Sequence, residues 1–137
     1  MLKKVLVIVL SLTLLISLFF FNRVPVIDRQ NEYEVYLGSY STSSQIKKVN
    51  SDGFKFILGI KGESFTTEIE EFYLEEFLSE LDACIIFIEN LTDSICYYGY
   101  SPKIKYLQML KGKLINVHIV VAKEVVKVGF PIIYGSF

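Results

Sequence analysis

The N-terminal segment, residues 1–21, constrains this chain more than any other feature. Lys3 and Lys4 are followed by an uncharged apolar run from Val5 to Phe21, which is interrupted only by Ser11, Thr13 and Ser17. As a helix with a rise of about 1.5 Å per residue, this run is about 25 Å long. Flanking residues extend it toward a bilayer core of about 30 Å. The pattern predicts a transmembrane helix.

A cleavable secretory signal needs small side chains one and three residues before the cut. The stretch SLFFFNRVPV, residues 17–26, offers large, basic or polar side chains around that position instead. No cysteine comes just after the apolar run, so a lipoprotein signal is excluded. We therefore expect an uncleaved anchor, with membrane contact through residues 5–21. The alternatives are a cleaved signal, which would give a secreted protein, and a buried soluble helix.

Charge sets the expected orientation and limits the partners. The positive-inside rule keeps Lys3 and Lys4 in the cytoplasm, which puts residues from Asn22 onward outside it. The chain has 14 basic and 15 acidic residues, so without this basic pair the remainder has a formal charge of −3. Nucleic-acid binding depends on basic residues that neutralise phosphates. We therefore expect no nucleic-acid partner.

The chain after the anchor has the length of one domain. We expect a stalk and polar linker over residues 22–52 and a folded domain over residues 53–137. Two cysteines, Cys84 and Cys96, are too few for a usual zinc site, and they are compatible with one disulfide or with two free thiols. We expect no metal and no cofactor.

The residues before position 63 give a mixed pattern. Val24–Asn31 contains a proline and small charged groups, which suggests a stalk. Tyr33–Leu37 favours a short strand. Gly38–Ser51 is polar and has no apolar periodicity, so we expect a loop or linker. Phe54–Ile60 is rich in aromatic and β-branched residues and predicts a strand that is closed by Gly62.

A helix is predicted to begin at Thr67, because Thr67 and Glu70 have the spacing of a capping box. Apolar residues at helical spacing form one stripe: Ile69, Phe72, Tyr73, Phe77, Leu78 and Leu81. Four glutamates beside this stripe could act as paired carboxylates or hold a cation: Glu70, Glu71, Glu75 and Glu76. We favour a solvated helix surface, because no cluster of His, Asn or Asp completes a site.

Ala83–Glu89 and Ser94–Tyr100 predict a hairpin around the turn Asn90–Asp93. In that register Phe87 opposes Cys96, and Cys84 points to the other face, which forbids a disulfide within the hairpin. A loop of odd length would put both sulfur atoms on one face, so the disulfide stays open. Asn90-Leu91-Thr92 also matches a glycosylation sequon, which matters only in a secretory pathway that modifies it.

Ser101-Pro102 should break this strand. A strand is expected to resume over Lys103–Leu107, and a turn is expected over Lys111–Lys113. The remaining chain predicts a second hairpin, formed by Leu114–Val121 and Val125–Tyr134.

His118 is the chain's one histidine. It is expected on the less buried face of its strand, and it has no nucleophile or carboxylate at a meaningful spacing. We therefore do not expect it to be catalytic. Pro131 should mark a sheet edge or a bulge, because proline cannot donate to a strand ladder.

Together these elements predict an α+β fold, in which one amphipathic helix packs on one face of an antiparallel sheet. Residues 63–137 resemble the YwmB family, which comprises exported proteins of spore-forming Gram-positive bacteria. The matching residues are Gly99, Tyr100, Ser101, Pro102, Gly112, Lys113, Ile115, Asn116, Gly129, Pro131, Ile132 and Ile133. The resemblance implies the fold described as TATA-box-binding-like, without DNA binding. This chain is shorter than the family in its N-terminal half.

We therefore expect a membrane-tethered, non-enzymatic interaction domain of the cell envelope, which the resemblance connects with sporulation. An exposed sheet edge near Gly129–Phe137 is the expected surface for an envelope protein partner. One alternative is an envelope hydrolase, in which two of the four glutamates named above converge on a pocket. The other is a small-ligand binder with a sizeable apolar cavity between helix and sheet.

Overall fold

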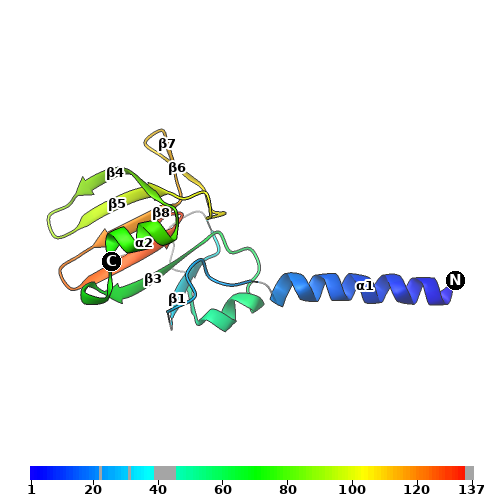
Figure 1. The fold of residues 1–137 in the computed structure, drawn as a ribbon. Helices are drawn as coiled ribbons and strands as arrows, with labels where there is room; N and C mark the ends of the chain where they lie inside the picture. The colour runs from blue at the N-terminus through cyan, green and yellow to red at the C-terminus, as the bar shows by residue number, and fades with distance from the viewer. Residues whose placement is uncertain (22, 31, 39–45, 135–137) are drawn as a thin grey trace.

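A computed structural model describes residues 1–21, 23–30, 32–38 and 46–134, with side chains to Leu18 in the first helix. Helix α1 (Leu2–Phe21) projects from one end of a folded domain (Figure 1). Its apolar side chains are exposed up to Leu18. Within the described residues, no helix is both long and apolar enough to cross a membrane.

The domain is an α+β fold, as predicted, built on an antiparallel sheet. Within the described residues the sheet has seven strands in the order β2-β1-β3-β9-β8-β5-β4. The strands are β1 (Tyr33–Tyr36), β2 (Ile46–Val49), β3 (Gly62–Glu68), β4 (Cys84–Asn90), β5 (Ile95–Tyr100), β8 (Val117–Val121) and β9 (Val125–Phe130). A separate hairpin is formed by β6 (Gln108–Leu110) and β7 (Lys113–Ile115).

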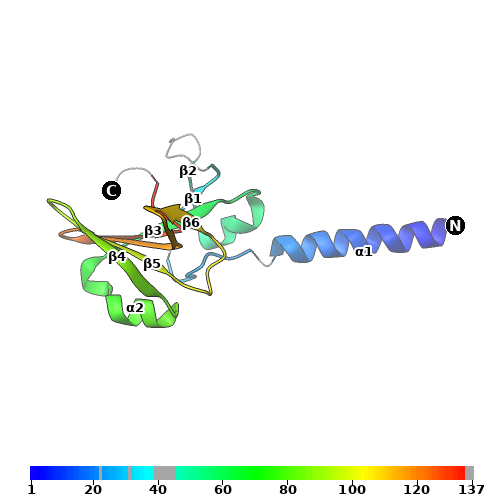
Figure 2. The ribbon, with the colours of Figure 1, turned by 90° about the horizontal axis from the view of Figure 1, so that it is seen from above.

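Short helices complete the fold. They are the 3-10 helices η2 (Ser51–Phe56) and η3 (Ile69–Glu71) and the α-helix α2 (Leu74–Glu80). Figure 2 shows α2 beside one face of the sheet. Phe77, Leu78 and Leu81 pack there against buried sheet residues, among them Phe65 and Val128. The predicted cover of one sheet face by a helix is confirmed.

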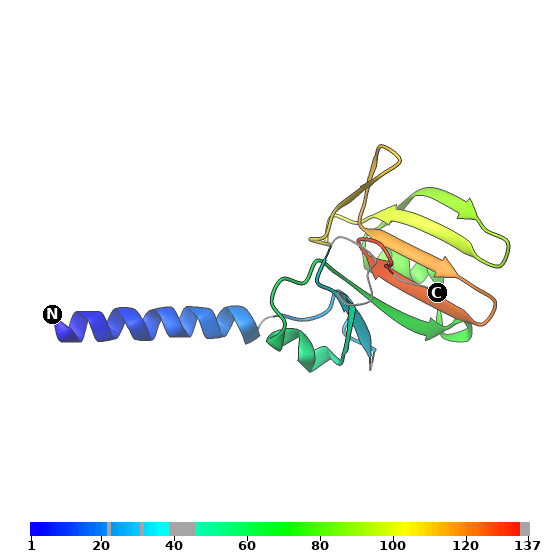
Figure 3. The same cartoon turned by 180° about the vertical axis from the view of Figure 1, so that it is seen from behind.

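The opposite sheet face is covered by the segment after β9 and by the β6–β7 hairpin (Figure 3). Ile133 is buried there with Cys96, Tyr98 and Val120. A Cβ at Gly129 would stand 2.6 Å from Cγ1 and 2.9 Å from the backbone nitrogen of Ile133. Glycine at this position therefore lets the C-terminal segment cross close over the sheet.

The predicted helix start at Thr67 is wrong. Thr67 belongs to β3, where it pairs with Val126 of β9, and α2 begins at Leu74 without a side-chain cap. The backbone around Thr67 is held by the sheet ladder, so long-range pairing overrides the local capping pattern. The observed helix is consequently shorter than the apolar stripe suggested.

Two predictions for the N-terminal part of the domain are also wrong. Ile46–Val49 forms a strand rather than a loop, and residues 39–45 of the same predicted loop lie outside the described residues. The strand predicted over Phe54–Ile60 is absent, because Ser51–Phe56 forms η2 and residues 57–60 form no strand. The Asn50 side chain accepts a hydrogen bond from the Gly53 amide at 2.8 Å and caps this helical turn. The short strand predicted near Tyr33 is confirmed as β1.

The stalk prediction is wrong as well, because the segment after α1 packs onto the domain. Pro25 and Ile27 are buried. The Arg23 guanidinium donates to the Ile57 carbonyl, and the Val26 amide donates to the Glu63 carboxyl group. The Tyr33 hydroxyl donates to the carbonyl of Ile27.

Both C-terminal hairpins are present, with a change of register in the first and shorter strands in the second, where Leu114 and Ile115 belong to β7 and the last strand ends at Phe130. Asn90 pairs with Ile95, so the loop is Leu91–Ser94, and a bulge lies between Ile85 and Phe87. Cys96 therefore opposes Glu89, and Cys84 opposes Tyr100. Both cysteines are free, with Cys84 exposed and Cys96 buried.

Three further predictions concern residues between the end of β4 and the start of β8. The turn at Lys111-Gly112 joins β6 to β7, and both residues have positive φ. The strand predicted over Lys103–Leu107 is wrong, because these residues precede β6 and form no strand. Asn90 of the sequon is exposed at the end of β4.

Candidate functional site

Three segments meet at the end of the domain from which α1 projects, and we call them the proximal end: residues 23–27, 51–61 and 101–107 (Figures 1 and 2). A cavity of about 700 Å³ lies among them. Its lining is largely apolar and includes Val24, Pro25, Val26, Ile27, Phe54, Ile60, Leu81 and Ile104. Its polar lining includes Arg23, Glu63, Glu80, Lys103, Lys105 and Tyr106.

Glu63 is the most unusual polar group in this cavity, because only 2% of its surface is exposed. It lies at the start of β3, where the strand turns its side chain toward the helix-covered face. One carboxyl oxygen accepts from the Val26 amide, and the other accepts from the Tyr106 hydroxyl at 3.1 Å. Burial raises the pKa of Glu63 to about 7, and the two hydrogen bonds oppose that shift.

Tyr106 and the basic side chains complete the cavity's polar chemistry. Burial, and then the negative charge of Glu63, raise the pKa of Tyr106, so its hydroxyl remains a hydrogen-bond donor at neutral pH. The Lys103 ammonium lies 2.8 Å from the Asp82 carboxylate. An apolar cavity with a few directional polar groups is typical of small-molecule sites. This arrangement suits a ligand with an apolar body and one polar or anionic group.

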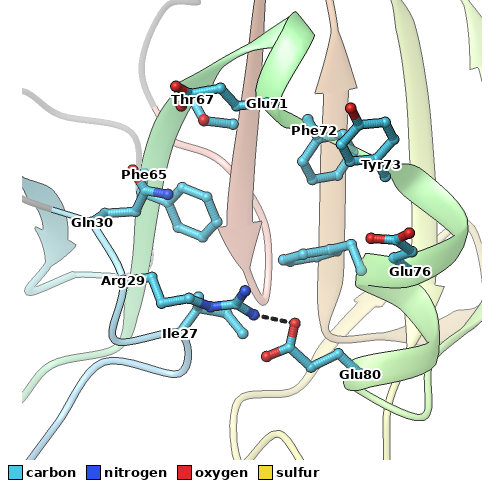
Figure 4. A pocket seen from close by; sticks show the side chains of 11 residues that line it. Ile27, Arg29, Gln30, Phe65, Thr67, Glu71, Phe72, Tyr73, Glu76 and Glu80 are labelled. Atoms are coloured by element: carbon cyan, nitrogen blue, oxygen red, sulfur yellow. Dashed lines mark hydrogen bonds and ion pairs between the residues drawn. The ribbon is translucent and has the colours of Figure 1, made fainter.

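The glutamates of the predicted acidic helix face do not form one cluster. Glu71 and Glu76 line a hollow of about 130 Å³ between α2 and the sheet, whereas Glu70 and Glu75 do not. In the view of Figure 4, the rings of Phe72 and Tyr73 lie between Glu71 and Glu76. Two of the four glutamates therefore reach one hollow, as the hydrolase hypothesis requires, but from different elements.

A third acidic residue of this hollow is neutralised. Glu80 pairs with Arg29, which brings the segment before β1 against the end of α2 (Figure 4). The hollow between helix and sheet is also far smaller than the proximal cavity. The sizeable apolar cavity that the small-ligand hypothesis expects between helix and sheet is therefore not found there in the described part of the chain, and the larger cavity lies at the proximal end instead.

The prediction that His118 lies on a less buried face is wrong, because only 3% of this side chain is exposed. Its ring stacks on Tyr98 with 4.4 Å between centroids, and Tyr98 stacks on Phe87. Its Nδ1 accepts from the Ile133 amide at 3.1 Å, while Nε2 has no hydrogen-bond partner among the described residues. Burial lowers the pKa of His118 to about 4, with the Glu89 charge opposing. His118 is thus a neutral core residue.

The expected sheet edge near Gly129–Phe137 is not an edge where it is described. β9 lies between β3 and β8, so Gly129 pairs with Ser64 on one side and with His118 on the other, and Phe130 pairs with Glu63. Pro131 follows the end of β9 in the sheet interior rather than at an edge. The edge strands of the described sheet are β2 and β4. Residues 135–137 lie outside the described residues.

Glu63 and Tyr106 were missed by the sequence reasoning. Glu63 lies in a stretch, GESFTTE, that looks polar, and Tyr106 is one of nine tyrosines. The carboxyl group is buried because β3 lies inside the sheet and the segments that carry Val26 and Tyr106 pack over its first residues. The one available signal was a lone acidic residue at the start of a strand.

Comparisons with known proteins add no identity. No group of His, Cys, Asp and Glu within the described residues could hold a metal ion. No family model matches this chain, and no curated protein or solved structure is significantly similar to it. The function is therefore inferred from the geometry of this structure.

Proposed function

We propose that the protein is a membrane-tethered, non-enzymatic interaction domain displayed outside the cytoplasm. The observation that carries the proposal is α1, whose exposed apolar side chains surround the helix rather than forming one stripe. A helix that is apolar on all sides is typical of a buried or membrane-inserted helix. Helix α1 contacts the domain at η2. The described part of α1 is not long and apolar enough by itself to cross a membrane, but lipid is the environment that suits its exposed apolar side chains.

The three hydroxyl groups of α1 support the same proposal. Ser11, Thr13 and Ser17 each donate to the carbonyl three residues earlier, at 2.9, 2.9 and 2.8 Å. A polar group in hydrocarbon needs a partner inside its own segment, because lipid offers none. The helix thus meets its polar requirements without water.

Tethering explains how a domain without catalytic machinery acts. Confinement to a membrane raises the effective concentration of the domain for neighbours on the same surface. The resemblance of residues 63–137 to the YwmB family supports a place in the cell envelope and a connection with sporulation. Within the described sheet, β4 offers a longer free edge than β2, so a partner strand would pair there.

The free cysteines provide a direct test of tethering and orientation. A membrane-impermeant maleimide added to intact cells should label Cys84, which is exposed, and not Cys96, which is buried. The label should remain in the membrane fraction. In a Cys84→Ser background, Lys3→Cys should be labelled only after permeabilisation. Labelled protein of full length in the soluble fraction, or Lys3→Cys labelling in intact cells, would contradict the proposal.

Small-ligand binding is a second candidate, favoured by the proximal cavity of about 700 Å³. Native mass spectrometry of the full chain released from detergent micelles should detect an added mass. The variant Ile60→Trp, which places a larger side chain into the lining, should reduce that mass. A Leu91→Trp control on the exposed β4–β5 loop should retain it. Equal occupancy in both variants would reject the cavity as the site.

A further inference from the structure

The proximal end is held next to the end of α1. Helix α1 ends at Phe21, and only one residue separates it from Arg23, which is already bonded to the Ile57 carbonyl. One residue spans at most about 3.6 Å of extended chain. The packed segment after α1 therefore leaves no spacer that could lift the domain away from a membrane containing α1.

The same end exposes large apolar side chains. Phe56 is 85% exposed, Leu58 is 64% exposed, and Val24 is 59% exposed. Phe56 ends η2, the element that lies against α1. Neighbouring exposed apolar side chains of this size are typical of an interaction surface.

Basic residues accompany these apolar side chains. The three segments of the proximal end contain five basic residues, Arg23, Lys55, Lys61, Lys103 and Lys105, and one acidic residue, Asp52. The chain as a whole is slightly acidic. The acidic residues beside these segments are buried or paired, because Glu63 is buried, Glu80 pairs with Arg29 and Asp82 pairs with Lys103. The exposed Lys61 and Lys105 therefore place positive charge at the end that faces α1, where anionic lipid headgroups attract basic side chains.

We propose that the proximal end is a lipid-binding surface, which inserts Phe56 and Leu58 into the interfacial layer of the membrane that holds α1 and sets Lys61 and Lys105 against anionic headgroups. This inference rests on the proposed tethering. A lipid surface fits better than a nucleic acid, because the apolar side chains lie among the basic ones and the helix end adjoins both. Aromatic and basic side chains at such a boundary have apolar bodies that enter the interface.

The chain contains no tryptophan, so single substitutions give clean depth probes. The full-length protein is reconstituted in vesicles of phosphatidylglycerol and phosphatidylcholine, with bromine on the acyl chains of the phosphatidylcholine as quencher. Three variants are compared: Phe56→Trp at the proximal end, Ile8→Trp inside α1, and Leu91→Trp on the β4–β5 loop. That loop lies at the end of the sheet away from α1 (Figures 1 and 2).

We expect Ile8→Trp and Phe56→Trp to lose most of their fluorescence and Leu91→Trp to keep it. Adding Lys61→Glu and Lys105→Glu to the Phe56→Trp chain should reduce its quenching in phosphatidylglycerol vesicles. If Ile8→Trp is quenched and Phe56→Trp behaves like Leu91→Trp, the lipid-binding surface is refuted while the anchor stands. If Ile8→Trp is not quenched, the tethering itself fails.

Discussion

Glu63 gives the sharpest quantitative prediction. Its pKa is raised from 4.5 to about 7, mainly by burial. The folded state therefore holds this proton more tightly than the unfolded state. Its contribution to stability is complete below pH 4.5 and is lost as the pH rises through 7. A shift of this size corresponds to about 3 kcal/mol of unfolding free energy.

The variant Glu63→Gln removes the titration and keeps the shape of the side chain. The glutamine oxygen can accept from the Val26 amide, and its NH₂ group can donate to the Tyr106 oxygen. We expect the variant to gain about 3 kcal/mol relative to wild type between about pH 4.5 and pH 8. Comparison with wild type is essential, because His118 titrates with the opposite sign and offsets Glu63 in the acidic part of this range.

The assay is urea unfolding of the full-length chain in nonionic detergent micelles, followed by far-ultraviolet circular dichroism at several pH values. Glu124→Gln, in the exposed turn between β8 and β9, is the matched control and shows what loss of a surface carboxyl does. If the free energies of unfolding of Glu63→Gln and wild type differ by the same amount at every pH, ionisation of Glu63 does not destabilise the folded state. The assignment of a buried, proton-holding carboxyl group would then be wrong.

Four further substitutions test other parts of the fold by the same unfolding measurement. His118→Asn keeps an acceptor for the Ile133 amide and should gain stability relative to wild type as the pH falls from 6.5 through about 4, where the folded protein resists protonating the ring; a stability difference from wild type that does not change with pH would refute this. Gly129→Ala should cost about 1–3 kcal/mol, because its Cβ would overlap Ile133, and a neutral effect would contradict the close crossing. Asn50→Ala should cost about 1 kcal/mol by removing the η2 cap. Thr67→Ala should cost less than Asn50→Ala, since Thr67 caps no helix, and the reverse order would restore the capping-box interpretation.

The sequence predicted the elements that depend on nearby residues. The β8–β9 hairpin and the turn at Lys111-Gly112 follow from alternating apolar residues and local turn chemistry. The sequence-based prediction failed where pairing between strands distant in the sequence decides the local structure. Thr67 carries a good capping pattern, but pairing with Val126 holds it in a strand. The strand β2 (Ile46–Val49) lies in a polar stretch that favours a loop, and it is held in the sheet by its pairing with β1.

The candidate site was harder to predict than the fold. Glu63 and Tyr106 are 43 residues apart, and their hydrogen bond joins the start of β3 to the segment before β6. The five basic residues of the proximal end are scattered from Arg23 to Lys105, so no run of charge marks them in the sequence. His118 looked half-exposed because strand alternation cannot reveal that the segment at Ile133 folds back over it.

The position of β9 in the sheet dictates when this domain can fold. β9 is the last strand along the described chain, yet it lies between β3 and β8. The two halves of the sheet have no ladder between them until β9 arrives. The core therefore closes only after the last described strand is in place. In the topology that we propose, with the domain outside the cytoplasm, β9 would have to cross the membrane before the domain folds.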